Sequence, residues 1–166
     1  ELPLISFIDT PGAYPGIESE ERGMSEAIAK NLSLLSNLKT PIIVIITGEG
    51  GSGGALAIGI GDHVCMLEHS IYAVASPEAC ASIVWRDGSK AKDAAEAMKV
   101  DALNLQNLGL VDEVIEEPLG GAHRDIRGVS NSISQVIEKK LLTFDEVDIS
   151  DLLNKRYEKI MSYGSI

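Results

Sequence analysis

The segment over residues 41–61, PIIVIITGEGGSGGALAIGIG, constrains the fold more than any other part of the chain. Its β-branched run at 42–47 predicts a buried strand, and the glycine cluster that follows leads directly into a helix of small residues. Between Gly48 and Gly54, functional side chains are carried by Glu49 and Ser52 alone. Chemistry at this point would therefore rest mainly on backbone N–H groups. The amides that open a helix have no partner within it, so they suit an anion or a developing oxyanion.

The composition is that of a globular and acidic chain. Of its 166 residues 45% are hydrophobic, and 25 acidic against 14 basic residues give a formal charge of −11. This charge argues against a nucleic-acid partner and against a polybasic membrane patch. No apolar run approaches the roughly 20 residues of a membrane span, and no signal-peptide pattern opens the chain, so we expect a cytoplasmic location. Cys65 and Cys80 lack metal-site spacing, which predicts reduced thiols and no metal.

Apolar runs, Gly/Pro turns and helical patterns alternate along the chain and predict an α/β domain. We expect strands at 4–8, 42–47, 63–67, 70–75 and 110–115, and helices at 19–38, from 76 onward, at 90–99, 102–108, 124–142 and 149–161. Because a strand, helix, strand order of this length needs a crossover, neighbouring strands should be parallel. The chain enters a strand pattern without an initiator methionine, which predicts a fragment whose sheet is completed by missing sequence or by a partner.

Two short motifs point to other chemistries. The sequence DTPG at 9–12 matches the DxxG element of GTPases, but it has no GxxxxGK[ST] phosphate loop or NKxD-type guanine reader beside it. The sequence GGSGG at 50–54 matches the GxSxG nucleophile elbow of α/β-hydrolases. A serine hydrolase with Ser52 as nucleophile and His63, His69 or His123 as base therefore stays open. A third interpretation also stays open, in which the glycines merely permit close packing of helix and strand.

Four segments together resemble the carboxyltransferase α-subunit family of bacterial and plastid acetyl-CoA carboxylases. In chain order they are IDTPGAYPGIESEERGMSEAIAKNL, ITGEGGSGGALAIG, YAVASPEACASIVWRD and LGLVDEVIEEPLGGAHRD. The resemblance implies the crotonase fold, in which ββα units are stacked around a sheet. It implies a carboxyltransferase domain over 1–125 that lacks its N-terminal part. A C-terminal helical extension over 126–166 would pack on the same domain or on a partner.

The same resemblance implies a reaction. A carboxyl group moves from carboxybiotin, held on the biotin carboxyl carrier protein, to acetyl-CoA, giving malonyl-CoA for fatty acid biosynthesis. Carboxybiotin releases CO2, the biotin anion takes the methyl proton, and the acetyl-CoA enolate attacks CO2. The protein then mainly supplies hydrogen-bond donors to two oxyanions, and loss of one such donor typically costs about 2.7–4 kcal/mol.

The resemblance also implies roles for individual residues. The amides of Gly50, Gly51 and Ser52 would form the oxyanion hole that faces the biotin ureido oxygen, with Ser52 acting through its N–H. Biotin and substrate would further be bound by a facing loop, formed by Gly12, Ala13, Tyr14 and Gly16, and by the carboxylate of Glu49. The ring of Tyr14 would offer an apolar face to biotin.

The implied partners are a homologous β subunit in an α2β2 assembly, the carrier protein and the ATP-binding biotin carboxylase. Zinc and most of the CoA site would belong to the β subunit, and a plant source would place the assembly in the plastid stroma. Two further alternatives stay open. One is a biotin-dependent carboxylase or decarboxylase of another acyl-CoA, and the other is a non-catalytic scaffold that binds partners through its C-terminal helices.

Overall fold

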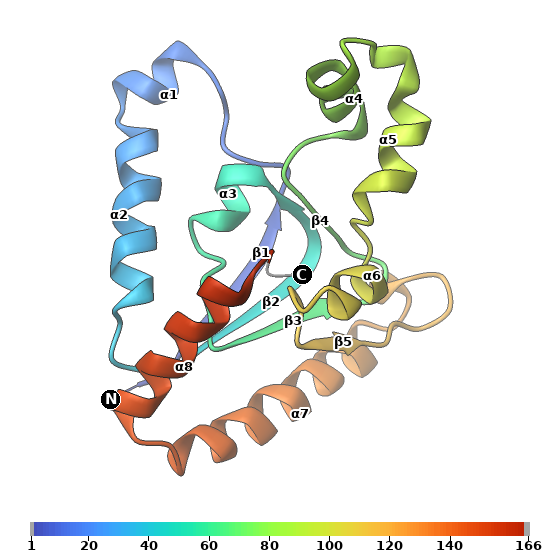
Figure 1. Ribbon diagram of the computed structural model, residues 1–166. Coiled ribbons are helices and arrows are strands. Elements are labelled where there is room, and N and C mark those ends of the chain that lie inside the picture. The colour runs from blue at the N-terminus through green and yellow to red at the C-terminus, as the bar shows by residue number, and fades with distance from the viewer. Residues whose placement is uncertain (1, 165–166) are drawn as a thin grey trace.

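The structure is a computed structural model that describes residues 2–164 (Figure 1). Its strands are β1 (Leu4–Thr10), β2 (Ile42–Gly51), β3 (His63–Leu67), β4 (Ile71–Ala73) and β5 (Glu113–Ile115). Its α-helices are α1 (Ile17–Glu21), α2 (Met24–Ser36), α3 (Ser52–Leu56), α4 (Pro77–Trp85), α5 (Ala91–Met98), α6 (Ala102–Asn107), α7 (Ile126–Asp145) and α8 (Ile149–Ser162). Two short 3-10 helices, η1 (Gly88–Lys90) and η2 (Ala122–Arg124), precede α5 and α7.

The strands form one parallel sheet in the order β1-β2-β3-β5, and β4 pairs with the far end of β2. Helices α1 and α2 make the crossover from β1 to β2. This arrangement confirms the α/β class and the parallel neighbours that the strand, helix, strand order predicts.

Strand β2 supplies both halves of the hydrophobic core. Ile42, Val44 and Ile46 pack on the side covered by α2, α3 and α6. Ile43 and Ile45 pack on the opposite side, against α7. Successive residues of a strand point to opposite faces, so a continuous apolar run belongs to a strand that is covered on both faces. The β-branched run of the sequence is explained by this double burial.

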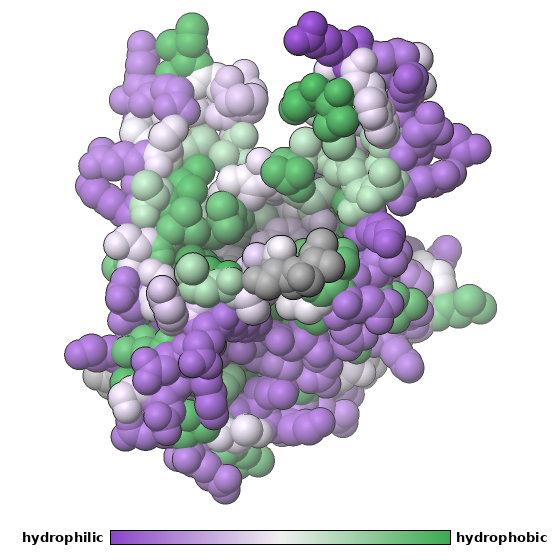
Figure 2. All heavy atoms as spheres, viewed as in Figure 1, coloured by the Kyte–Doolittle hydropathy of each residue, from purple (hydrophilic) through white to green (hydrophobic). Residues whose placement is uncertain are grey.

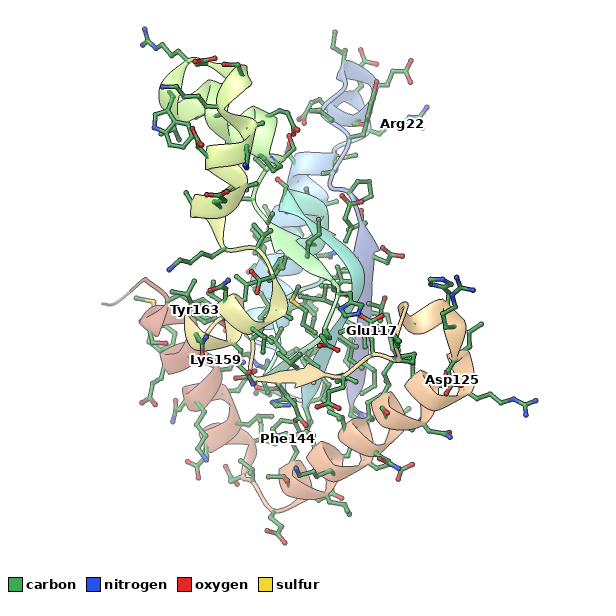
Figure 3. All side chains as sticks on the ribbon, turned by 90° about the vertical axis from the view of Figure 1, so that its right-hand side faces the viewer. Arg22, Glu117, Asp125, Phe144, Lys159 and Tyr163 are labelled. Carbon is green, nitrogen blue, oxygen red and sulfur yellow. The ribbon has the colours of Figure 1, made fainter. Side chains whose placement is uncertain are left out.

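The C-terminal helix α7 packs on the sheet, whereas α8 packs beside α2. In α7, Val129 is buried and is followed at helical spacing by further core-facing residues, namely Ile133, Val136, Ile137, Leu141 and Phe144. Figure 3 shows Phe144 near the end of α7, at the opposite end of the molecule from Arg22. Helix α8 buries Leu152 and Arg156. Across the described residues, every helix is too short or too polar to span a bilayer.

Several predicted boundaries are wrong, for identifiable reasons. The helix predicted over 19–38 is two helices, because Gly23 between α1 and α2 has a left-handed φ of 77°. The strand predicted over 110–115 begins only at Glu113, because the amides of Leu110 and Val111 donate to the carbonyl of Leu105 in α6. The strand predicted over 70–75 is likewise shorter, at 71–73, while the strand predicted over 42–47 continues through the glycines to residue 51.

Two helical arms rise from one end of the sheet (Figure 1). One consists of α1 and the adjoining part of α2, and the other of α4, η1 and α5. Helix α4 begins as predicted, with Ser76 as N-cap: its hydroxyl accepts a hydrogen bond from the Ala79 amide at 3.2 Å. The α4–α5 arm buries Ala81 and Ala94 and leaves large apolar side chains exposed, namely Ile83, Val84 and Trp85.

Candidate functional site

Strand β2 changes its neighbour before it ends. Residues 43–46 pair with β3, whereas residues 49–51 pair with β4. Helix α3 starts at the next residue, Ser52. The carboxyl end of the central strand is therefore the point where β4, the β1–α1 loop and a new helix meet, and ligands of parallel sheets bind at such strand ends.

A cleft of about 340 Å³ lies at this end of β2. Glu49, Gly50, Gly51 and Ser52 all line it, and Ser76 adds a further polar group. The remaining lining is apolar: Pro11, Ile71, Ala73, Ala75, Pro77, Met98 and Val100. This size is at the lower limit of small-molecule sites, which span roughly 300–1,000 Å³. Figure 2 shows the surface hollowed between the two arms, with hydrophobic residues along its sides.

The glycines of this segment are surrounded closely by their own chain. A Cβ on Gly51 would overlap the Pro11 carbonyl, and one on Gly54 would lie 2.7 Å from the carbonyl carbon of Gly12. A Cβ on Gly50 would lie 2.8 Å from the ring of Tyr72. Contacts this short would force the backbone or the ring to shift. Close packing therefore accounts for glycine at positions 50, 51 and 54, whatever the cleft binds.

The β1–α1 loop lies against this turn, and the structure brings part of the predicted facing loop to it. A Cβ on Gly12, which has a φ of +135°, would lie 3.4 Å from the Gly51 carbonyl oxygen. The Ala13 methyl group is 3.8 Å from the corresponding position on Gly53. None of the four predicted loop residues lines the cleft itself, namely Gly12, Ala13, Tyr14 and Gly16; from this loop only Pro11 does. Tyr14 is 70% exposed, and its ring lies over Gly16, where a Cβ would overlap it.

Ser52 occupies the sharp turn between strand and helix. Its φ of 46° is in the left-handed region, which residues with a Cβ rarely adopt. Ser52 is the first residue of α3. Like the amides of Gly53 and Gly54, its amide has no acceptor within the helix. The side chain is exposed. Both its backbone N–H and its hydroxyl are thus candidates for contact with a bound molecule.

The geometry does not support a hydrolase triad at Ser52. His63 pairs in register with Ile43, near the start of β2. Gly51 lies eight strand positions further on, which corresponds to about 26 Å at 3.3 Å per residue. The His63 ring instead contacts Glu113, at 3.1 Å. Within residues 2–164, no hydrogen bond joins the Ser52 hydroxyl to a histidine.

A second polar cluster lies far from the cleft, between β3 and β5. His63, Cys65 and Glu113 bring one potential metal-ligating atom each within 4.8 Å of one another. Burial lowers the pKa of His63, and Lys140 acts in the same direction against the opposing effects of Glu113 and Asp112. Burial also raises the pKa of the Cys65 thiol to about 12. The thiolate is the form that binds metals, and the expected absence of a metal site stays a prediction.

The α4–α5 arm contributes a wall of the cleft that the sequence does not reveal. Met98 ends α5, and Val100 follows it through Lys99, which has a left-handed φ of 50°. Nothing in the local pattern places this turn beside the glycines. For Ser76 a signal is visible, because the Ser-Pro pair marks the start of α4 close after β4.

Comparison with known proteins relates both the sequence and the fold to other chains. A family described as acetyl co-enzyme A carboxylase carboxyltransferase-like matches residues 1–164. The acetyl-coenzyme A carboxylase carboxyl transferase subunit alpha of Vibrio cholerae is 56% identical over 163 residues, covering 98% of this chain and 51% of that protein. The chain thus spans about half the length of the curated relatives it matches.

Two solved structures show the fold. A Pseudomonas malonate decarboxylase hetero-tetramer in complex with coenzyme A superposes with a TM-score of 0.67 at 18% identity, over 93% of this chain and 60% of that chain. An enoyl-CoA hydratase/isomerase from Marinobacter aquaeolei superposes with a TM-score of 0.54 at 16% identity, over 93% and 57% of the two chains. These likenesses confirm the predicted crotonase fold. The chain therefore belongs to the acetyl-CoA carboxylase carboxyltransferase family.

Proposed function

We propose that this chain is part of a carboxyltransferase α subunit that transfers a carboxyl group from carboxybiotin to acetyl-CoA, giving malonyl-CoA for fatty acid biosynthesis. The observation that carries the proposal is the turn from β2 into α3, which lines a small cleft with backbone and has no histidine beside its serine. Such a site suits a reaction whose base comes from the substrate. Membership of the carboxyltransferase family supports the same reading.

The amides of Gly51 and Ser52 are the proposed oxyanion donors. They close β2 and open α3, and both residues line the cleft. Gly50 stays a predicted third donor, one residue deeper, between Thr10 of β1 and Tyr72 of β4. Preorganised N–H groups stabilise a developing negative charge without reorganising during the reaction. The Pro11 carbonyl packs directly against Gly51, where it leaves no room for a Cβ.

The cleft also fits the fused ring of biotin in size and chemistry. Ile71, Met98 and Val100 offer apolar walls for its hydrocarbon part, and the amides at the turn offer donors to its ureido oxygen. When bound, carboxybiotin supplies the carboxyl group and the base. Glu49 lines the same cleft and is proposed to accept a hydrogen bond from the ligand. Tyr14 is proposed to contact the ligand from the outer side of the loop.

The names of the relatives support the proposed assembly. The matched relatives are named as alpha subunits, and the malonate decarboxylase neighbour is a hetero-tetramer. We propose that this chain pairs with a β subunit in an α2β2 carboxyltransferase. The β subunit would carry the zinc. It would work with the biotin carboxyl carrier protein and with the ATP-using biotin carboxylase. The proposed location is the cytoplasm, or the plastid stroma for a plant protein.

The test is malonyl-CoA decarboxylation in the presence of biotin, measured for the full-length subunit with and without a carboxyltransferase β subunit. We expect activity only when both chains are present. Ser52→Ala keeps the backbone donor and should retain most of this activity, whereas a serine hydrolase would lose nearly all of its own. Inactivity in every pairing, together with labelling of Ser52 by a fluorophosphonate, would overturn the proposal in favour of the hydrolase.

A further inference from the structure

The register between β1 and β2 shifts just before the cleft. Ile8 lies opposite Ile46, and Thr10 lies opposite Gly50, so four steps along β2 match two along β1. The extra residues form a bulge in β2 within 47–49. Bulges bend a strand and increase its local twist. This bulge coincides with the place where β2 leaves β3 and pairs with β4.

One side chain of β1 lies opposite the bulge. The Asp9 carboxylate accepts a hydrogen bond from the Glu49 amide, with the Oδ1 and N atoms 3.0 Å apart. It also lies so close to Gly48 that a Cβ there would overlap Oδ1 and approach Cγ to 2.9 Å. A second bond joins the Thr47 hydroxyl to the Ile8 carbonyl at 3.3 Å. Two hydrogen bonds that involve side chains thus join β1 to the bulge, at Thr47 and at Glu49, where the regular register is interrupted.

Among residues 2–164, the Asp9 carboxylate has no cationic partner. Asp9 is exposed. A carboxylate that accepts from a backbone amide makes one of the stronger hydrogen bonds in proteins. The amide that it holds belongs to Glu49, and the next residues, 50–52, line the cleft.

We infer that Asp9 is a positioning residue for the reaction at the cleft. By holding the Glu49 amide, it fixes the bulge that aims the backbone of Gly51 and Ser52. This inference rests on the proposed function. Donors must lie about 2.7–3.1 Å from the charge they stabilise, so a small displacement of the turn removes their effect. Asp9 itself touches no reacting atom in this scheme.

The experiment compares Asp9→Ala and Asp9→Asn in the full-length subunit assembled with its β subunit. Asp9→Ala should lower kcat by on the order of 10- to 100-fold, as misplaced catalytic groups do, with little change in KM for malonyl-CoA. Asp9→Asn keeps an oxygen acceptor at the same place and should recover most of the rate. The matched control is Asp148→Ala, which removes another exposed aspartate that accepts from a backbone amide, that of Ser150, at 2.8 Å.

Hydrogen exchange gives a readout that does not depend on activity. In Asp9→Ala the amides of residues 47–52 should exchange at least about tenfold faster, corresponding to 1.4 kcal/mol or more at these sites. Asp148→Ala should leave this segment unchanged. Unaltered exchange at 47–52, or full kcat in Asp9→Ala, would overturn the inference. If the wild type lacks carboxyltransferase activity, the proposed function fails instead, and the role of Asp9 in holding the bulge is still decided by exchange.

Discussion

The guanidinium of Arg156 and the carboxylate of Asp62 form a bidentate pair across 94 residues of sequence, with N–O distances of 2.8 and 2.7 Å. Both side chains are buried, at 0% and 4% exposure. The remaining guanidinium N–H groups donate to backbone carbonyls of Leu35, Leu38 and Thr40. Asp62 also accepts from the Ile42 amide at 2.7 Å. One side chain of α8 thereby joins the end of α2 to the start of β2.

Replacing Arg156 by Leu should lower the free energy of unfolding by about 3–5 kcal/mol, because it leaves the buried Asp62 carboxylate without its partner. Urea denaturation measures this. The control is Lys30→Ala, which removes a pair with Glu26 of the same 2.7 Å length whose side chains are 74% and 69% exposed. That variant should lose less than about 1 kcal/mol. Equal effects of the two changes would contradict the importance of burial.

Replacing Gly51 by Ala should abolish most of the proposed malonyl-CoA decarboxylation, because the new Cβ would overlap the Pro11 carbonyl and displace the turn. We expect a kcat at least about a hundredfold lower, since loss of one oxyanion donor alone costs 10²–10³. Gly109→Ala is a control for strain, because Gly109 has a φ of +74° but no atom within 4 Å of an added Cβ. A Gly51→Ala enzyme with normal kcat would refute the proposed role of the turn.

The stability of the protein should fall on mild acidification, in part because of His63. Burial and Lys140 hold the pKa of this ring below its ordinary value of 6.5. The unfolded chain then binds the proton more readily than the folded one. The contribution of His63 to the free energy of unfolding is therefore complete above about pH 6.5 and is lost as the pH falls below that value. The slope contributed by one group is at most about 1.4 kcal/mol per pH unit. Urea unfolding of the wild type and His63→Gln between pH 7.5 and 5 should show a flatter profile for the variant, and parallel profiles would contradict this assignment.

The two cysteines should differ in reactivity. Cys65 is fully buried and its pKa is raised to about 12, so it presents almost no thiolate near neutral pH. Cys80, in α4, is partly exposed. Iodoacetamide followed by peptide mass spectrometry should label Cys80 in the native protein and Cys65 only after unfolding. Labelling of both at the same rate in the folded state would show that β3 opens more readily than its burial indicates.

Local patterns suffice for the parts of this fold that depend on local physics. The β-branched run at 42–46 predicts a strand buried on both faces, and Ser76-Pro77 predicts the start of α4. The break at Gly23 is harder to predict, because a glycine inside a helical pattern is compatible with an unbroken helix as well. The left-handed φ of Gly23 coincides with the end of α1, where the Gly23 amide donates to the Glu20 carbonyl at 2.9 Å.

At the site, too, some features can be predicted from the sequence and others cannot. The glycine turn is evident from the sequence, and the family resemblance places Glu49, Gly50, Gly51 and Ser52 together. The bulge that involves Asp9 is not visible in the sequence. The register between β1 and β2 depends on how the two strands pair, and a crossover separates them along the chain. Met98 and Val100 line the cleft because of where the α4–α5 arm lies in the folded chain. No local sequence pattern indicates that position.

The α4–α5 arm buries little more than Ala81 and Ala94, yet it provides Met98 at the wall of the cleft. Most of its described packing is between its own helices. The sheet, in contrast, is held by the double burial of β2 and by Arg156. The arm and the sheet are therefore held by largely separate sets of contacts, so we expect substitutions in the arm to change the shape of the cleft with little effect on the melting temperature of the domain.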